Sequence, residues 1–414
     1  MNRNNRWYLP IVVGLIILTL TIIRFTSPDE NVVTDPLAGP ITIEEQLGHD
    51  PGLLTAWQND FAQQIDAVDE HDGVRFHVQQ MIADELRMAI LYTLESTIEG
   101  RPFAITDLKM TDENGNSLRA SYSYGDPKHT TDERVQDMVD ITFAEGAGLP
   151  HQITLTFTAA LSGTDQLPLP PNGATKTYSV TFPVKQEQFK GKKRDYPINQ
   201  SVTLAGQSIT VKRITMYPTK TAVEMMYDPQ NTHKIFGIDN LRIVSESGKE
   251  WKSTDGLTIS QLAEDHVIYY LDSAYFSASE PFRLVADSIR AVPKDQLDVV
   301  LDIRSQKLLK TPDDSISLER FETGEDTATI EFAVNEDDRN APGNPTAHLF
   351  FSSFTDNLGK QFESAEHFYR NGEKQARVGF TLEDYTYAPN RTMLTLRLSD
   401  YPARLDGEFS IPLQ

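Results

Sequence analysis

The residue types that carry enzyme chemistry are present in the chain, but they are not grouped. The nine histidines are scattered, and none forms the His-x-x-x-His or His-Glu-x-x-His pattern that holds zinc. Cysteine is absent, which removes thiolate metal sites, cysteine nucleophiles and disulfides. No Gly-x-Ser-x-Gly turn, phosphate-binding glycine-rich loop or Ser-x-x-Lys motif occurs. We therefore expect no enzyme activity, and we assign no catalytic, cofactor-binding or metal-binding residue.

Acidic clusters leave calcium binding open as an alternative. Two of them are Asp313-Asp314 and Glu336-Asp337-Asp338. The segment 112–116 resembles the start of a calcium loop, but it lacks the glycine at the sixth position and the distal glutamate. A hairpin turn is the better interpretation there. For the other two clusters we expect a solvated acidic surface and no cofactor.

The overall charge bears on possible partners. The 414 residues include 38 Lys and Arg against 60 Asp and Glu, a net charge of −22. Such a chain is not expected to bind nucleic acid, which requires clustered positive charge. The basic run Lys190–Arg194 stands out, and it could contact an anionic envelope polymer or phospholipid headgroups. The alternative is a solvated linker that charge repulsion keeps extended.

The N-terminus carries the pattern of a membrane anchor. Arg3 and Arg6 precede an uncharged, apolar run over residues 7–23, which as a helix would span ~26 Å. We expect an uncleaved transmembrane helix over 7–25 that anchors the protein in the cell membrane. Residues 1–6 would lie in the cytoplasm, and the residues after the helix would lie outside the cell. A cleaved signal peptide is the alternative, but the run is long and no small-x-small cleavage site follows it.

Three segments of the chain share one spacing of apolar residues, which indicates an internal repeat. In each segment the distance from the second apolar position to the following Ala or Thr is eight residues. The matching positions are Val78, Met81, Ala89-Ile90 and Tyr92; Val211, Ile214, Ala222-Val223 and Met225; and Leu318, Phe321, Thr329-Ile330 and Phe332. Apolar residues alternate within these runs, as in half-buried strands.

Two further landmarks follow each copy. The first is a glycine turn between two apolar stretches, at Gly115, Gly248 and Gly359, where a hairpin needs positive φ. The second is an alternating strand that we expect to close each unit. These closing strands are 178–184, 297–303 and 409–413. Short strands separated by turn signals are typical of a β-sandwich.

We therefore expect a mainly β protein in which a transmembrane helix is followed by three tandem Ig-like β-sandwich domains. One helix is expected over 51–65, capped by Asp50 and started by Pro51. The predicted boundaries are a tail 1–6, a transmembrane helix 7–25, a tether 26–46, domain 1 at 47–185, a basic linker 186–199, domain 2 at 200–304, a linker 305–312 and domain 3 at 313–414.

Two stretches resemble a known family. Asp72–Val78, Ile82–Glu85 and Ala89–Glu95 resemble a domain-of-unknown-function family of Gram-positive envelope proteins. Residues 202–303 resemble its companion domain, through Thr219–Val223, Asp228–Asn231, Ile235–Arg242 and Tyr269–Phe276. The resemblance implies an extracytoplasmic Ig-like module, as found in the outer part of anti-sigma-factor-like single-pass membrane proteins. It supplies no catalytic residues, and residues 1–6 are too few to hold a sigma factor.

The expected function is accordingly a membrane-anchored, non-catalytic binding or sensor module of the bacterial cell envelope. Its partner would be an unidentified protein or envelope polymer, with a possible link to sigma-factor or envelope-stress signalling through that partner. The alternative is a structural or adhesive scaffold, in which the domains act as a spacer rod.

Overall fold

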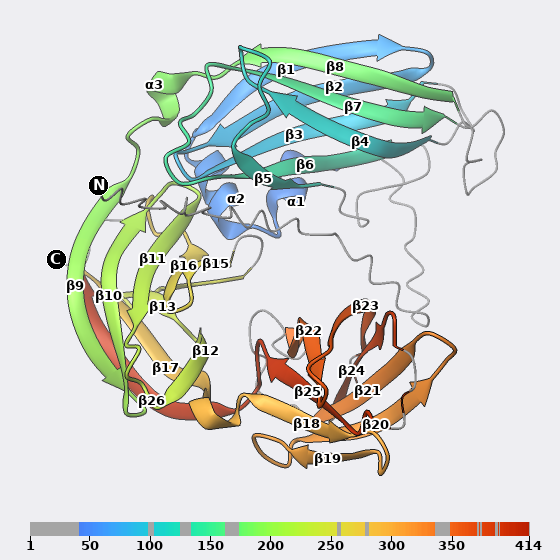
Figure 1. Cartoon of the computed structure of the whole chain (residues 1–414). Coiled ribbons are helices and arrows are strands. Elements are labelled where there is room, and N and C mark those ends of the chain that lie inside the picture. Colours follow the sequence, from blue (N-terminus) through green and yellow to red (C-terminus); the bar gives the residue numbers. More distant parts are fainter. Residues whose placement is uncertain are drawn as a thin grey trace, which may run out of the picture.

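The computed structural model describes residues 41–97, 103–124, 134–161, 174–254, 258–277, 281–335, 348–370, 372, 375–385, 388 and 390–413, and these ranges are mainly β (Figure 1). The expected fold class is corrected on one point. None of the helices in these ranges is long and apolar enough to cross a membrane, so the expected membrane-spanning helix is not found. The expected helix 7–25, the tail 1–6 and most of the tether 26–46 lie outside the described residues.

Unit 1 covers residues 41–189 and has its own apolar core between two sheets. One sheet has five strands in the order β1-β2-β3-β6-β5, and the other has three in the order β4-β7-β8. Two helices precede the strands and a third follows them. The elements are α1 (Ile43–Leu47), α2 (Pro51–Gln58), β1 (Ala62–His71), β2 (Val74–Ala83), β3 (Arg87–Ser96), β4 (Phe103–Thr111), β5 (Ala120–Ser123), β6 (Arg134–Phe143), β7 (Gln152–Leu161), β8 (Ala174–Pro183) and α3 (Gln186–Phe189).

Helix α2 begins as the sequence predicts but ends earlier. The Asp50 side chain accepts a hydrogen bond from the Leu53 N–H at 3.0 Å, and Pro51 occupies the first turn. The helix stops at Gln58 rather than at 65, because Asp60 takes a left-handed φ of 57°. Residues from Ala62 onward then pair with β2. The apolar residues Phe61 and Ile65, which were expected on the helix, follow it in the chain.

Unit 2 also contains two sheets, and it is built from two separate parts of the chain, 194–293 and 404–413. The first sheet has the order β15-β16-β11-β10-β9, and the second has β12-β17-β13-β14 with β26 added to β17. The strands are β9 (Arg194–Leu204), β10 (Gln207–Met216), β11 (Lys220–Tyr227), β12 (His233–Asp239), β13 (Arg242–Ser245), β14 (Glu250–Lys252), β15 (Ile259–Ala263), β16 (His266–Asp272), β17 (Phe282–Pro293) and β26 (Arg404–Leu413).

Unit 3, residues 297–403, is inserted between β17 and β26 of unit 2. Its eight strands form one folded sheet in the order β19-β18-β25-β22-β23-β24-β21-β20. Strand β23 joins the two halves, since its start pairs with β22 and its remainder with β24. The elements are η2 (Lys294–Gln296), which leads into the unit, β18 (Asp298–Asp302), β19 (Lys307–Lys310), β20 (Ile316–Thr323), β21 (Ala328–Asn335), β22 (Phe350–Asp356), β23 (Gln361–Arg370), β24 (Gln375–Leu382) and β25 (Met393–Leu398).

The internal repeat is confirmed at the level of strand register. Val78, Val211 and Leu318 each lie in the first strand of an antiparallel hairpin and pair with Tyr92, Met225 and Phe332, respectively. In all three hairpins a register shift follows immediately after that pair. The three glycines of the second landmark have φ values of +79°, +85° and +81°. The same apolar spacing therefore encodes the same bulged hairpin three times.

The structure differs from the expected boundaries at two closing strands. Strand β18, expected to close domain 2, pairs with β25 and packs in the core of unit 3. Strand β26, expected to close domain 3, pairs with β17 along its length and packs in the core of unit 2. An alternating pattern predicts a half-buried strand but does not specify its sheet. Strand β18 thus belongs to unit 3 instead of unit 2, and β26 belongs to unit 2 instead of unit 3.

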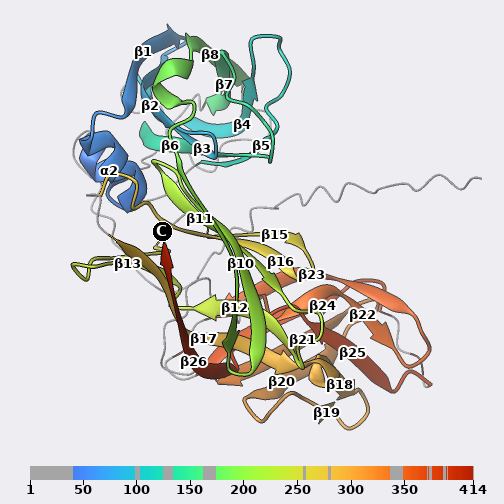
Figure 2. The same cartoon turned by 90° about the vertical axis from the view of Figure 1, so that its left-hand side faces the viewer.

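The two expected linkers are also structured. The segment 186–199 contains α3 and the first half of β9, and Phe189 is buried in the core of unit 1. The segment 305–312 contains β19, an edge strand of unit 3. In Figure 1 the three units follow an arc with unit 2 in the middle, and Figure 2 shows unit 1 above units 2 and 3, which overlap in that view.

Candidate functional site

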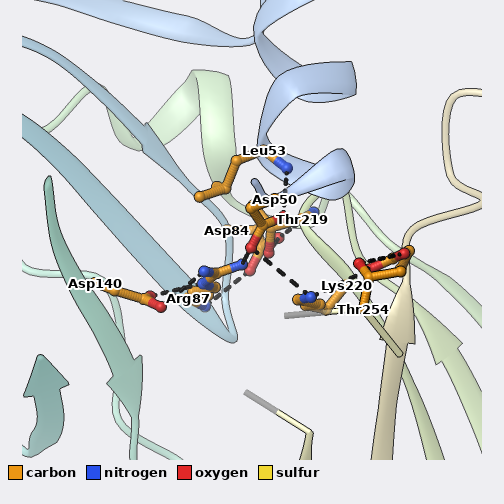
Figure 3. Close-up of polar contacts among 9 residues, drawn as sticks. Asp50, Leu53, Asp84, Arg87, Asp140, Thr219, Lys220 and Thr254 are labelled. Atoms are coloured by element: carbon orange, nitrogen blue, oxygen red, sulfur yellow. Dashed lines mark hydrogen bonds and ion pairs between the residues drawn. The ribbon is translucent and has the colours of Figure 1, made fainter. Parts of the chain in front are cut away.

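The most highly buried charged groups of the described chain lie where unit 2 meets unit 1. The turn between β10 and β11, Tyr217–Lys220, is closed by a hydrogen bond from the Tyr217 N–H to the Lys220 carbonyl and contacts α2 and the β2–β3 turn of unit 1 (Figure 3). We name this turn the hairpin tip. Around it lies the junction cluster: Asp50, Asp84, Arg87 and Asp140 of unit 1, with Thr219, Lys220, Thr254 and Asp272 of unit 2.

Arg87 is the centre of the unit 1 side. Its Nη1 donates to Asp50 Oδ2 at 2.6 Å, and its Nε and Nη2 donate to the two oxygens of Asp140 at 2.7 Å each. The side chain is fully buried at the start of β3, directly before the apolar run Met88–Tyr92. Asp50 therefore has two roles, since one oxygen caps α2 and the other holds the guanidinium.

Lys220 carries the positive charge of the unit 2 side. Its Nζ lies 3.3 Å from Asp272 Oδ1 and 3.7 Å from Asp50 Oδ2, and the side chain is fully buried. The Thr254 hydroxyl donates to the same Asp272 carboxylate at 2.8 Å. Asp50 is thus shared by a cation from each unit, which ties the two units together through one carboxylate.

Asp84 is buried without a cation. Its Oδ1 accepts hydrogen bonds from the Leu86 and Arg87 N–H groups, and its Oδ2 accepts from the N–H and hydroxyl of Thr219, at 2.9 and 2.7 Å. No ion pair of Asp84 occurs among the residues that the structure describes. A carboxylate in the β2–β3 turn of unit 1 therefore binds the hairpin tip through neutral donors only.

The carboxyl groups of the junction cluster respond differently to their surroundings. Burial alone would raise the pKa of Asp50, but Arg87 and Lys220 together hold it below its usual value. Burial raises the pKa of Asp84 despite its four hydrogen bonds. Burial also raises the pKa of Asp272, against the opposing charge of Lys220. The pKa of a carboxyl group in this cluster is therefore lowered where two cations lie close to it, as at Asp50. It is raised where burial outweighs neutral donors or a single cation, as at Asp84 and Asp272.

Apolar and exposed contacts surround the junction cluster. Phe276 of unit 2 packs edge-on against Phe61 of unit 1, with ring centroids 5.7 Å apart. Within the expected basic linker, the Lys193 Nζ donates to Glu85 at 2.8 Å, and Glu85 also accepts from the Gly191 N–H. A Cβ at Gly52 would lie 2.1 Å from the Thr219 carbonyl oxygen, so glycine is required for this close approach.

A second ionic group lies at the other end of unit 2, towards unit 3. Asp239 pairs with Arg290 at 3.4 Å and with Arg404 at 3.1 Å, while Arg290 also lies 3.2 Å from Asp400. The next residue, Tyr401, donates to Asp313 at 2.5 Å inside unit 3. In the connection from β25 to β26, Asp400 therefore contacts Arg290 of unit 2, and Tyr401 contacts Asp313 of unit 3. Burial raises the pKa of Asp400 to about 6.

The charged side chains of the junction cluster are largely buried. Asp84, Arg87 and Lys220 are fully buried, so a substrate cannot reach them in this arrangement. Each carboxylate and cation of the junction cluster already contacts a counter-charge or a hydrogen-bond donor. Within the described ranges, no three His, Cys, Asp or Glu side chains are placed to hold a metal ion. The arrangement joins units 1 and 2 through side-chain contacts.

The residues singled out from the sequence lie elsewhere. Asp112 accepts from the Asn114 and Asn116 N–H groups in a plain turn, as predicted. Asp313 accepts from Ser315 and Tyr401, and Glu336-Asp337-Asp338 lies outside the described residues. Within the basic run, Lys190, Lys192 and Lys193 are exposed, Lys193 pairs with Glu85, and Arg194 lies over the Tyr275 ring.

The junction cluster was not predicted from the sequence, although one signal for it was present. Arg87 directly precedes the apolar run Met88–Tyr92, and Lys220 is the first residue of β11, another strand of the repeat. A charged residue adjoining a fully buried strand requires a buried partner. The partners are 37 and more residues away in the chain, so their identity could not be inferred.

The fold and the junction define a multi-unit, mainly β protein, and two of its segments match family models of unknown function. Residues 1–96 match a domain of unknown function (DUF4179), and residues 193–308 match a family of unknown function (DUF5643). The expected resemblance to uncharacterised families is confirmed to that extent. Most of the junction cluster lies within these two matched segments, with Asp140 outside both.

Solved structures offer only distant similarity. A conserved domain protein from Bacillus anthracis matches with 12% identity and a TM-score of 0.43, covering 91% of this chain and 100% of that one. An uncharacterised protein from Listeria monocytogenes EGD-e matches with 9% identity and a TM-score of 0.13, covering 76% of this chain and 29% of that one. No curated protein matches the chain.

Proposed function

We propose that this chain is a non-catalytic binding or sensing module that acts outside the cytoplasm in a bacterial cell envelope. The observation that carries the proposal is the junction cluster, whose charges are buried and paired between two units. While the contact is closed, such a cluster holds units 1 and 2 in one relative position, and its own charged groups are not exposed to a substrate. A partner protein would carry the output, including any link to sigma-factor or envelope-stress signalling.

Unit 3 is the favoured site of partner contact. Of the exposed large apolar side chains in the described residues, the three that are more than half exposed are Leu309, Phe351 and Leu358, and all three belong to unit 3. Loops and exposed apolar side chains on a rigid scaffold are where sandwich proteins place recognition. A scaffold or spacer function is the second candidate, because fixed junctions at both ends of unit 2 would suit it equally well.

A replacement experiment separates the two functions. Residues 297–403 would be exchanged for an unrelated β-sandwich with adjacent termini, so that β17 and β26 stay connected. In parallel, Phe351→Asp/Leu358→Asp would alter the exposed apolar side chains of unit 3, with Val68→Asp on unit 1 as the matched control. The full-length proteins would be crosslinked in their native cells, and a sigma-dependent reporter would be followed.

If the chain is a binding module, one crosslinked partner and the reporter response are lost with both the replacement and the double substitution. Val68→Asp should retain them. If the replacement retains the partner and the response, unit 3 serves only as a spacer and the binding proposal fails for it.

A further inference from the structure

We propose that the contact between units 1 and 2 is a proton-linked latch. Seating the hairpin tip in unit 1 is coupled to proton uptake in the junction cluster, so mildly acidic solution holds the two units together and rising pH loosens them. This regulation is a property of the junction itself and does not depend on which partner the module binds.

The first support is the charge balance of the cluster. Unit 1 contributes three carboxyl groups and one guanidinium, and unit 2 contributes one ammonium and one carboxyl group (Figure 3). Closing the contact thus brings four carboxyl groups and two cations into a region where most of these side chains are buried. One proton taken up by a carboxyl group reduces this excess of negative charge.

The second support is the position of Asp84. Before the hairpin tip is seated, Asp84 Oδ2 faces the space that Thr219 fills afterwards. Closure replaces water at this oxygen with the Thr219 N–H and hydroxyl, which are neutral. Burying an ionised carboxylate among neutral donors is unfavourable, whereas a protonated one is tolerated. If Asp84 Oδ2 carries a proton, it can donate that proton to the Thr219 hydroxyl oxygen at 2.7 Å. Asp84 Oδ2 can still accept a hydrogen bond from the Thr219 N–H at 2.9 Å.

The other titratable and charged groups facing Asp84 set the direction and range of the effect. They come from every element at the contact: Asp50 before α2, Glu85 in the β2–β3 turn, Arg87 at the start of β3, Asp140 of β6, Lys190 and Lys193 before β9, Asp195 in β9, Tyr217 and Lys220 of the hairpin tip, and Asp272 of β16. Burial raises the pKa of Asp272 as it does that of Asp84, so both groups favour closure as pH falls.

Two groups act in the opposite direction but at lower pH. The pKa of Asp50 is held below its usual value by Arg87 and Lys220, against the effect of burial, and that of Glu85 is lowered by Lys193. Their contribution to closure is lost only as pH falls through and below their usual values, 3.8 and 4.5. Above that range the protons bound by Asp84 and Asp272 determine the sign. The latch therefore closes as pH falls towards that range.

Hydrogen exchange of the intact chain tests the proposal directly. The Thr219 amide exchanges only when the hairpin tip leaves Asp84, so its exchange rate, corrected for the intrinsic pH dependence, reports the opening equilibrium. We expect the opening constant to rise between pH 5 and pH 8, by up to about tenfold per pH unit for one linked proton. An opening constant that is flat or falls with pH overturns the proposal.

Two variants assign the protons. In Asp84→Asn and in Asp272→Asn the pH dependence of Thr219 exchange should be reduced, whatever the level of protection, whereas Asp107→Asn at the surface of unit 1 should leave it unchanged. If the Thr219 amide of Asp84→Asn is unprotected from exchange at every pH, the pH dependence measured in Asp272→Asn decides whether the junction cluster binds the proton. An unchanged slope in both cluster variants overturns the proposal, because the protons then bind elsewhere.

A distance measurement separates opening of the units from fraying of the hairpin tip alone. Because the chain has no cysteine, Lys109→Cys in unit 1 and Glu246→Cys in unit 2 provide two unique labelling sites. Spin labels at these sites should give a narrow distance distribution at pH 5 and a broader one at pH 8. A distribution that stays narrow while Thr219 exchanges would show local fraying and refute the latch.

Discussion

The two ends of unit 2 are both joined to a neighbour through buried ion pairs, but they are built differently. At the unit 1 end, the Thr219 N–H and hydroxyl of unit 2 donate to the fully buried Asp84 at 2.9 and 2.7 Å, and the fully buried Lys220 lies 3.7 Å from Asp50. At the unit 3 end, Arg290 forms ion pairs of 3.2–3.4 Å that lack hydrogen-bond geometry, and its side chain is 10% exposed. The first contact relies on exact side-chain pairing and the second does not.

The covalent connections explain this difference. Unit 1 is connected to unit 2 by a single segment between α3 and β9, so non-covalent contacts must fix its position. Unit 3 is connected twice, through η2 and through the segment from β25 to β26. These two covalent connections already restrict the position of unit 3, so ion pairs need to contribute less to holding it in place. A junction with one connection therefore needs the tighter cluster.

Loss of Arg87 should have the largest effect. In Arg87→Met, Asp50 and Asp140 lose the cation between them, and we expect a destabilisation of about 3–5 kcal/mol in urea unfolding of the full chain. Arg377→Met is the matched control, since the Arg377 side chain is 51% exposed in its pair with Glu319, and it should change stability by less than about 1 kcal/mol. Similar effects of the two substitutions would contradict the importance of the junction cluster.

Gly52→Ala should weaken the same junction by a backbone clash. The new Cβ would lie 2.1 Å from the Thr219 carbonyl oxygen, so the hairpin tip must move, at about 1–3 kcal/mol. Faster hydrogen exchange is expected in the hairpin tip and in α2, with little change in unit 3. Gly148→Ala, which has open space around it, should leave exchange unaltered. Equal exchange in the two variants would mean that this close approach is not tight.

Asp239→Asn should weaken the unit 3 junction without detaching unit 3. Both Arg290 and Arg404 lose their shared carboxylate, and we expect a destabilisation of about 2 kcal/mol. Small-angle scattering should show little change in overall dimensions, because both chain crossings remain. A large expansion would show instead that the ion pairs, rather than the connections, hold unit 3 in place.

The pH dependence contributed by Asp400 should be the smallest effect. Its pKa of about 6 in the fold lies above the usual 3.8, so between these values the folded chain binds more protons than the unfolded one. Asp400 therefore lowers stability as pH rises from about 4 to about 6, by about 1–2 kcal/mol, and contributes no further change above that. The difference between wild type and Asp400→Asn in thermal unfolding isolates this slope. No difference across pH 4–7 would exclude it.

Local features of the fold were predictable because local chemistry determines them. The bulged hairpins at Val78, Val211 and Leu318 follow from apolar spacing, and the positive φ of Gly115 follows from the needs of a tight turn. The start of α2 follows from an Asp–Pro pair that both caps and initiates a helix. In each case the information lies within about fifteen residues.

Long-range features were not predictable in the same way. Strand β26 has the alternation of any half-buried strand, and nothing in Phe409, Ile411 or Leu413 indicates that β17 is its neighbour. The junction cluster likewise joins Asp84 to Thr219 across 135 positions of sequence. Burial drives such pairings, but many strands and many carboxylates satisfy the same local pattern. A single sequence therefore indicates that a partner exists without identifying it.

The insertion of unit 3 into unit 2 also sets an order of folding. Pairing of β17 with β26 must close a loop that contains residues 294–403. If that loop were unfolded, its closure would cost about 4 kcal/mol in chain entropy. A folded unit 3 holds its own two ends close together and removes most of this penalty. During synthesis, one edge of β17 must therefore stay unpaired, with only β12 and β13 beside it, until unit 3 has folded and β26 has emerged from the ribosome.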